Sequence, residues 1–343
     1  MVTRLAAVAV LALACTTGST VVPASAAAPV ARTATAAPRY TVTVSADAFG
    51  SPGALIPAIV TLHGADRSTR AELTLDTPLV DGTCVGVPWF NPVRHTLSRT
   101  CYAQLPATRS PITLRGRAVV DGVAVRGWAA RPYRPAGPVT TGRVTVAQAQ
   151  AIGRCGNTTT DVWLTFDDSI SATQVRRLLP VLARNHVRAR FFLLGSWYRA
   201  DPSLRARLVA AGHFVLNHSD THPALTGISD MQVRRQISRG VHTSGQPRVL
   251  RPPYGAGAFT ARLAALARQQ GYTLCRWTTD TFDWQEPGAA IMSERLRYGD
   301  AVTAPVGPGG VVLMHSSHAS TITAVQRIVD TIRAKGLRLD RLP

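Results

Sequence analysis

Two patterns of hydrophobic and polar positions follow one another along this chain of 343 residues. Residues 40–44 and 112–120 alternate between apolar and polar side chains, a period of two that is typical of strands with one buried face. Asp121-Gly122 stands between two such runs and predicts a tight β-hairpin. We therefore expect a smaller all-β, sandwich-like accessory domain over residues 40–135.

After residue 135 the pattern changes, and we place a Pro/Gly-rich linker at 136–145. Over residues 146–343, short apolar runs alternate with segments whose apolar residues recur at helical spacing. Strands are predicted at 161–166, 187–195, 213–216, 272–277 and 310–314, and helices at 172–185, 202–211, 260–271 and 321–335. This alternation predicts an α/β domain with a parallel sheet or barrel, in which functional side chains gather at the carboxyl ends of strands.

The N-terminus has the pattern of a secretory signal peptide. Arg4 precedes the apolar residues 5–14, and small side chains for cleavage follow at 24–26. Lipid attachment at Cys15 is the alternative. No later apolar run reaches about 18 residues, so no transmembrane segment is expected. We expect a secreted, extracellular protein and leave association with the cell wall open. The N-terminal residues are divided into a signal peptide at 1–26 and a flexible lead-in at 27–39.

Removal of such a signal peptide would leave four cysteines, which permit three disulfide pairings. An oxidising compartment favours disulfides over free thiols. Cys84 with Cys101 would close a short loop in the β-rich region, and Cys155 with Cys275 would then tie two strands of the α/β region. Because no CxxC pair occurs, a cysteine zinc site is disfavoured.

The chain has a formal net charge of +19, and Lys335 is its only lysine among 38 basic residues. The arginines are scattered rather than clustered, which argues against a nucleic-acid groove. A plain solvated surface and attraction to an anionic cell-wall polymer are both consistent with this charge.

Five short polar segments lie at or just after the predicted strands. Each alone has an ordinary structural explanation, such as a solvated turn or a structural histidine. Together they supply the carboxylates, imidazoles, guanidinium and apolar wall that a hydrolytic metal site requires. The five segments are 165–168, 218–223, 251–255, 280–284 and 313–315.

The first two segments suggest a metal centre. Asp167 and Asp168 are adjacent at a strand end, where neighbouring side chains point to opposite faces, so one can bind a metal while the other acts as a base. His218 and His222 are spaced to share one ion. With one Asp they form a two-His, one-carboxylate set that suits Zn²⁺ hydrolysis or Fe²⁺ oxygen chemistry. Ser219 stands where the HExxH metalloproteases carry Glu, so a protease of that kind lacks its base.

The other segments supply positioning and acid groups. Arg251 precedes two prolines with fixed φ angles and can lock a carboxylate in a bidentate pair. Asp283 can orient His315 as a general acid. Trp284 offers an aromatic wall for a small apolar group.

In this order the five segments resemble the motifs of the NodB-homology polysaccharide deacetylases, carbohydrate esterase family 4, over residues about 155–335. The resemblance implies a distorted (β/α) barrel. It also implies metal-dependent hydrolysis of N- or O-acetyl groups on a polysaccharide such as peptidoglycan, chitin-like oligomers or acetylxylan.

Carried onto this chain, the resemblance assigns the metal and the base. Asp168, His218 and His222 would bind a divalent metal, most often Zn²⁺. Asp167, held in place by Arg251, would take the proton from the attacking water.

The resemblance also assigns the acid and the substrate contacts. His315, tuned by Asp283, would protonate the leaving nitrogen. The backbone N–H of Tyr254 would stabilise the oxyanion, while Trp284 and Leu313 would line the slot for the acetyl methyl group.

Three departures from the family pattern leave the choice of substrate open. Ser169-Ile170 replaces Gly-Pro, Arg190 replaces Thr, and residues 212–217 differ before the first histidine. Two other classes are weighed as alternatives: a non-catalytic glycan-binding protein on the same scaffold, and an Fe²⁺ oxygenase, in which Asp167 would have no role.

Overall fold

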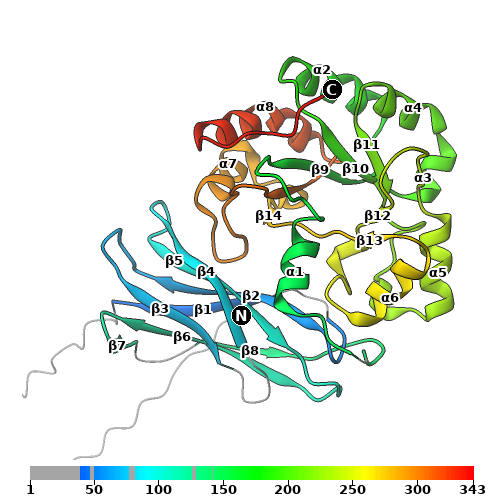
Figure 1. The fold of residues 1–343 in the computed structure, drawn as a ribbon. Helices are drawn as coiled ribbons and strands as arrows, with labels where there is room; N and C mark the ends of the chain where they lie inside the picture. The colour runs from blue at the N-terminus through cyan, green and yellow to red at the C-terminus, as the bar shows by residue number, and fades with distance from the viewer. Residues whose placement is uncertain (1–38, 47–49, 77–81, 126–128, 141) are drawn as a thin grey trace, which may run out of the picture. The chain divides into compact units, whose positions relative to one another are not determined.

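A computed structural model describes residues 39–46, 50–76, 82–125, 129–140 and 142–343 (Figure 1). The expected signal peptide and most of the expected lead-in therefore lie outside the described residues. Residues 38–343 form one compact unit. The division into an accessory domain, a linker and a catalytic domain stays a prediction.

Residues 41–133 form two antiparallel sheets. One has the strand order β1-β2-β5-β4, and in the other β6 pairs with β3, β7 and β8. The strands are β1 Thr41–Ala46, β2 Leu55–His63, β3 Ala71–Asp76, β4 Gly82–Asn91, β5 Thr96–Gln104, β6 Ile112–Val120, β7 Val123–Ala124 and β8 Ala129–Tyr133.

The two sheets share one apolar core, to which Val60 of β2 and Leu114 of β6 contribute fully buried side chains. Gly116 of β6 permits their close approach, because a Cβ atom there would lie only 2.5 Å from Cγ2 of Val44. The hairpin predicted at Asp121-Gly122 is confirmed: both residues have positive φ, and Val120 pairs with Val123.

The C-terminal region contains seven parallel strands in the order β13-β12-β11-β10-β9-β15-β14. The strands are β9 Trp163–Asp168, β10 Ala189–Leu193, β11 Phe214–Asn217, β12 Val249–Leu250, β13 Thr273–Leu274, β14 Thr279–Asp280 and β15 Val311–His315. The helices are α1 Val146–Gly153, α2 Ala172–Arg184, α3 Gly195–Ala200, α4 Pro202–Ala210, α5 Asp230–Arg239, α6 Ala261–Gln269, α7 Gly288–Tyr298 and α8 Ala319–Ala334, with short 3₁₀ turns η1 Leu225–Gly227, η2 Pro253–Gly255 and η3 Asp283–Gln285.

The expected α/β class and parallel strands are confirmed, but the sheet is a half-barrel rather than a closed barrel. Within residues 142–343, β13 and β14 form the two edges and do not pair with each other. β12, β13 and β14 have only two residues each, so the chain leaves the sheet soon after entering it. Pro252 and Pro253 follow β12 and have no N–H to extend the ladder.

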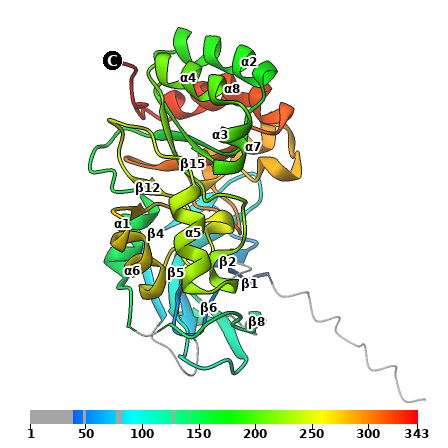
Figure 2. The same ribbon diagram turned by 90° about the vertical axis from the view of Figure 1, so that its right-hand side faces the viewer.

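Three helices begin with a reciprocal hydrogen-bonded cap that satisfies backbone N–H groups at the helix start. The caps are Thr145 with Gln148 at α1, Ser171 with Gln174 at α2 and Ser229 with Gln232 at α5. Helices α2, α4 and α8 lie together on one side of the parallel sheet in both views (Figures 1 and 2). Their apolar residues, together with those of α7, complete the main core against β9, β10 and β15.

Polar contacts join the β-rich residues to the α/β residues within the compact unit. The buried amide of Asn91, at the end of β4, donates to the carbonyl of Gly299 over 2.6 Å. The backbone N–H of Leu55 donates to the carbonyl of Phe259 over 3.3 Å. Gly299 directly follows α7. Because α7 comes immediately after the η3 turn, the contact with Asn91 links β4 to a helix whose preceding turn belongs to the site described below.

Candidate active site

Three side chains from two strand ends converge on one point. Asp168 ends β9, and His218 and His222 lie in the loop after β11. One ligand atom from each side chain lies within 4.8 Å of the other two. The Nε2 atoms of His218 and His222 are 3.3 and 3.1 Å from Oδ1 of Asp168. Residues 218–222 form neither helix nor strand, and this loop brings the two imidazoles to one ligand oxygen.

The surroundings of Asp168 fit a divalent cation. Apart from the imidazole nitrogens of His218 and His222, its buried Oδ1 has no hydrogen-bond partner among the described residues. Burial alone would raise the pKa of Asp168, but the imidazoles of His218 and His222 lower it well below the usual range. Asp168 is therefore ionised at neutral pH, as a metal ligand must be.

The orientation of His218 also suits metal binding. The side chain is 1% exposed, and its Nδ1 lies 2.8 Å from the backbone carbonyl of Arg251. Because a carbonyl only accepts hydrogen bonds, Nδ1 carries a proton, and Nε2, which faces Asp168, is the nitrogen available to a metal. One carboxylate and two imidazoles are a common donor set for catalytic zinc, so these residues fit the metal that the sequence predicts.

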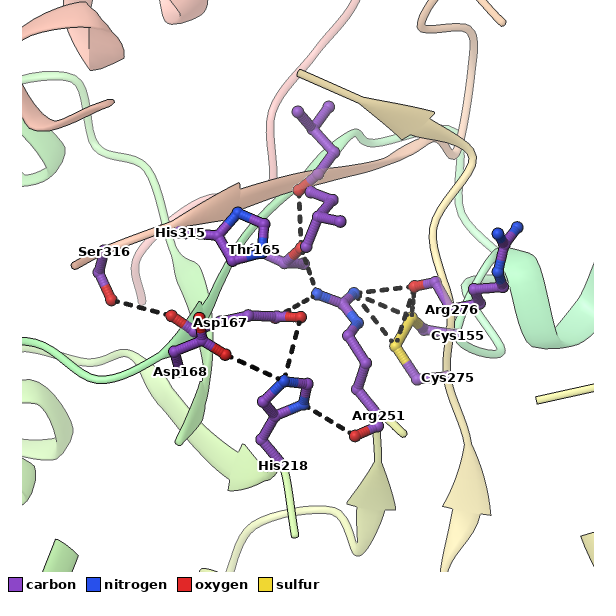
Figure 3. Close-up of polar contacts among 12 residues, drawn as sticks. Cys155, Thr165, Asp167, Asp168, His218, Arg251, Cys275, Arg276, His315 and Ser316 are labelled. Carbon is purple, nitrogen blue, oxygen red and sulfur yellow. Dashed lines mark hydrogen bonds and ion pairs between the residues drawn. A yellow bond between two sulfur atoms is a disulfide. The ribbon is translucent and has the colours of Figure 1, made fainter. Parts of the chain in front are cut away.

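Arg251 binds one oxygen of the second carboxylate, Asp167, whose other oxygen lies 3.8 Å from Nε2 of His218 (Figure 3). The side chain of Arg251 is completely buried, and Nη1 donates to Oδ1 of Asp167 over 2.7 Å. Nη1 also donates to Oγ1 of Thr165 over 2.8 Å, and Nη2 donates to the carbonyl of Arg276 over 2.8 Å. The ring of Phe192 lies 4.0 Å below the guanidinium carbon. Burial lowers the pKa of Arg251, but the charge of Asp167 opposes that shift.

His315 and Asp283 form a second pair on the other side of Asp167. His315 ends β15 and lies opposite Asp167 in the register of β9 and β15. Its Nδ1 is 2.8 Å from Oδ1 of Asp283, whose Oδ2 accepts from the backbone N–H of His315 over 2.6 Å and from Oγ1 of Thr321 over 2.5 Å. Burial lowers the pKa of His315, but Asp283, with smaller contributions from Asp167 and Asp168, raises it to about 9. His315 is therefore protonated near neutral pH, with Nε2 free to donate a proton.

Three further residues, Tyr254, Trp284 and Leu313, are predicted to contact the substrate. Tyr254 lies in the η2 turn with φ of 60°, and its ring is 4.6 Å from that of His222 in a T-shaped contact. Trp284 follows Asp283 and is half exposed, while Leu313 is buried in β15. The roles of these residues in an oxyanion site and a methyl slot stay predictions.

The sequence analysis gave no individual role to three residues that support the site. Thr165 accepts from Arg251 and donates to the carbonyl of Val312 over 2.6 Å. Thr321 supports Asp283 from α8. Asp280 is buried at the end of β14, where burial raises its pKa to about 7, and its Oδ1 accepts from the N–H of Phe282 over 2.7 Å. Thr165 and Asp280 lie in two of the five segments singled out above, whereas Thr321 lies outside them and acts through a neighbour that is distant in sequence.

The structure contains both disulfides that we expected. Cys84 of β4 is bonded to Cys101 of β5, its register partner. Cys155 is bonded to Cys275, whose Sγ is 3.3 Å from Nη2 of Arg251. The second disulfide therefore forms part of the wall around the buried guanidinium.

Comparison with known proteins decides the family. A model of the polysaccharide deacetylase family matches residues 156–275. The chain is 30% identical to a chitooligosaccharide deacetylase of Sinorhizobium fredii over 213 residues, which cover 57% of this chain and 95% of that protein. The chain belongs to the polysaccharide deacetylase family. The expectation of a carbohydrate deacetylase is thus confirmed at the level of the family.

Two other relatives each match about half of the chain. A peptidoglycan-N-acetylglucosamine deacetylase of Listeria monocytogenes is 33% identical over 178 residues, 50% of this chain and 36% of that protein. A solved family 4 carbohydrate esterase from Streptomyces lividans, in complex with acetate, is 34% identical and covers 52% of this chain and 91% of its own, with a TM-score of 0.46.

The buried ion pair gives a stability prediction for this deacetylase. Arg251→Met leaves the carboxylate of Asp167 buried without a partner, so we expect the free energy of unfolding to fall by about 3–5 kcal/mol. Urea denaturation measures the change. Arg251→Met combined with Asp167→Leu removes both charges and should recover much of that loss.

Arg338→Met is the matched control, because Arg338 pairs with Asp161 while its side chain is 77% exposed. We expect its effect to stay within about 1 kcal/mol. Equal effects of Arg251→Met and Arg338→Met would contradict the importance of the buried pair.

Proposed function

We propose that this protein is a secreted, divalent-metal-dependent hydrolase that removes acetyl groups from an acetylated polysaccharide. The observation that carries the proposal is the division of two adjacent carboxylates. Asp168 faces two imidazoles in a ligand cluster, while a buried guanidinium occupies one oxygen of Asp167. A glycan-binding protein needs neither this division nor the Asp283–His315 pair.

The substrate class that we propose is a polymer that contains N-acetylglucosamine. Two relatives are named for chitooligosaccharide and for the N-acetylglucosamine of peptidoglycan, which share an acetamido sugar. Removal of an acetyl group from nitrogen also suits an acid such as His315. The nitrogen leaving group is more basic than the alkoxide released from an O-acetyl group, so it depends more on protonation as it leaves. Acetylxylan, an O-acetylated polymer, is the less favoured candidate.

Asp168, His218 and His222 would hold the metal, with Zn²⁺ the preferred ion for this donor set. When bound, a divalent ion lowers the pKa of water and polarises an acyl carbonyl. The protein contributes orientation: the bond from His218 Nδ1 to the carbonyl of Arg251 fixes the ring and its tautomer.

Asp167 is placed to act as the general base. Arg251 occupies its Oδ1, while Oδ2 lies 3.8 Å from Nε2 of His218, on the side of the ligand cluster. A water between the cluster and Oδ2 could pass its proton to Asp167 as its oxygen bonds to the acetyl carbon.

His315 is placed to act as the general acid. Cleavage of the C–N bond leaves a free amine and acetate, and His315 Nε2 supplies the proton that the amine takes up. The backbone N–H of Tyr254 is our candidate donor to the oxyanion that forms between the two proton transfers.

The extracellular location is supported by the N-terminal pattern and by two disulfides in a single chain. The net charge of +19 would favour retention near an anionic cell-wall polymer. No helix in the described part of the chain is both long and apolar enough to cross a bilayer.

Acetate release tests the proposed function. Purified protein should release acetate from N-acetylglucosamine oligomers or peptidoglycan, lose activity after metal removal by a chelator, and regain it with Zn²⁺. Asp167→Asn should lower the rate by about 10²–10⁴-fold, because it removes the base. Asp161→Asn, a change near the start of the same strand, is the control and should retain activity.

Binding of the polymer without acetate release would favour the non-catalytic alternative. Full activity after metal removal would contradict the metal site.

The Asp283–His315 pair predicts the alkaline limb of the pH profile. The general acid works only when protonated, so activity should fall as the pH rises through the pKa of His315. Asp283 raises that pKa, so in Asp283→Asn the limb should move to lower pH, with a lower maximal rate. The dependence of kcat/KM on pH measures the shift; an unmoved limb would mean that a different group is the acid.

A further inference from the structure

Asp220 lies between His218 and His222 in the sequence, but its carboxylate pairs with other residues. Its side chain is 7% exposed and contacts two arginines on neighbouring helices. Oδ1 pairs with Nη2 of Arg199 on α3, and Oδ2 lies 2.8 Å from Nε of Arg239 on α5. Nη1 of Arg199 also donates to the carbonyl of Arg239 over 2.8 Å. The carboxylate thus ties the histidine loop to two helices at once.

The backbone of the loop is anchored to the same two helices. The carbonyl of Asp220 accepts from the N–H of Ser196, at the start of α3, over 3.0 Å. The N–H groups of Asp220 and Thr221 both donate to Oε1 of Gln236 on α5 over 3.0 Å, and Nε2 of Gln236 donates to Oγ1 of Thr221 over 2.9 Å. Side chain and backbone therefore hold the loop in one position.

The loop needs such anchoring because its backbone is unfavourable on both sides of Asp220. Ser219 has φ of 72° and His222 has φ of 66°, a region that residues other than glycine adopt at a cost of order 1 kcal/mol or more. Strained conformations persist only where the surroundings fix them. Without the Asp220 contacts, the loop would gain freedom to leave this conformation.

His222 depends on the loop more than His218 does. His218 is fully buried and oriented by the carbonyl of Arg251. The side chain of His222 is 25% exposed; its backbone N–H donates to Oγ of Ser219 within the same loop over 3.2 Å, and its ring contacts that of Tyr254. A loosened loop would therefore displace the imidazole of His222 first.

We propose that Asp220 is a positioning residue that pre-organises the metal site. By pairing with Arg199 and Arg239, it holds loop 218–222 with the imidazole of His222 directed at Asp168 before an ion enters. This inference rests on the proposed function, because it concerns the same metal site. Residues that support metal ligands in this way change metal affinity by about 10–100-fold when they are replaced.

The test measures Zn²⁺ affinity in the full-length protein, by competition with a chromophoric chelator. Asp220→Asn keeps the shape but removes the charge, and we expect Zn²⁺ to bind about 10–100-fold more weakly. Arg239→Gln removes one partner and should weaken binding in the same direction, which covers the case in which an Asp220 variant fails to fold. Asp230→Asn is the matched control on the same helix, because Asp230 pairs with Arg262 away from the loop.

A merely structural role would make Asp220→Asn lower the melting temperature of the metal-free protein while Zn²⁺ affinity stayed at the wild-type value. That result overturns the inference and leaves the proposed function intact. Wild-type protein that binds no divalent metal overturns the proposed function instead. Weaker binding in both Asp220→Asn and Arg239→Gln, with unchanged binding in Asp230→Asn, supports the inference.

Discussion

The buried ion pair between Arg251 and Asp167 is the constraint on which the site depends. Two carboxylates stand next to each other at the end of β9, and either could bind a cation. Arg251 is fully buried and occupies Oδ1 of Asp167, so Asp167 is matched by a fixed positive charge within the protein. Asp168 faces the imidazoles of His218 and His222 instead, and we propose it as the metal ligand. The pair thus gives two adjacent, chemically equivalent carboxylates different surroundings, which the proposed function uses as base and ligand.

The parallel sheet supplies the rest of the geometry. Because β9 lies between β10 and β15, its terminal aspartates have the histidine loop on one side and His315 on the other. Asp167 and His315, the proposed base and acid, lie opposite each other in register, on strands separated by about 4.8 Å. β13 and β14 do not pair with each other, so the half-barrel stays open between them. Because both strands lie at the edges of the sheet, this opening does not disturb the arrangement around β9.

The sequence predicts the candidate site residues better than the elements and contacts that hold them in place. Asp167, Asp168, His218 and Arg251 follow apolar runs, and their chemistry is visible in a motif. The two-residue strands β12 and β14 are too short for any periodic pattern, so the open half-barrel could not be predicted. Helix α5, which contacts the histidine loop, buries only Val233 and Ile237. Because most of its side chains are polar, its apolar spacing does not predict a helix. Contacts such as Thr321 with Asp283 depend on tertiary packing over long sequence distances.

A crystal of the zinc-loaded protein, with anomalous scattering recorded at the zinc edge, tests the central claim most directly. The account predicts one zinc peak within about 2.0–2.2 Å of Asp168, His218 Nε2 and His222 Nε2, with Asp167 still paired to Arg251. A zinc ion bound by Asp167 in place of Asp168, or no peak between these three residues, would contradict it.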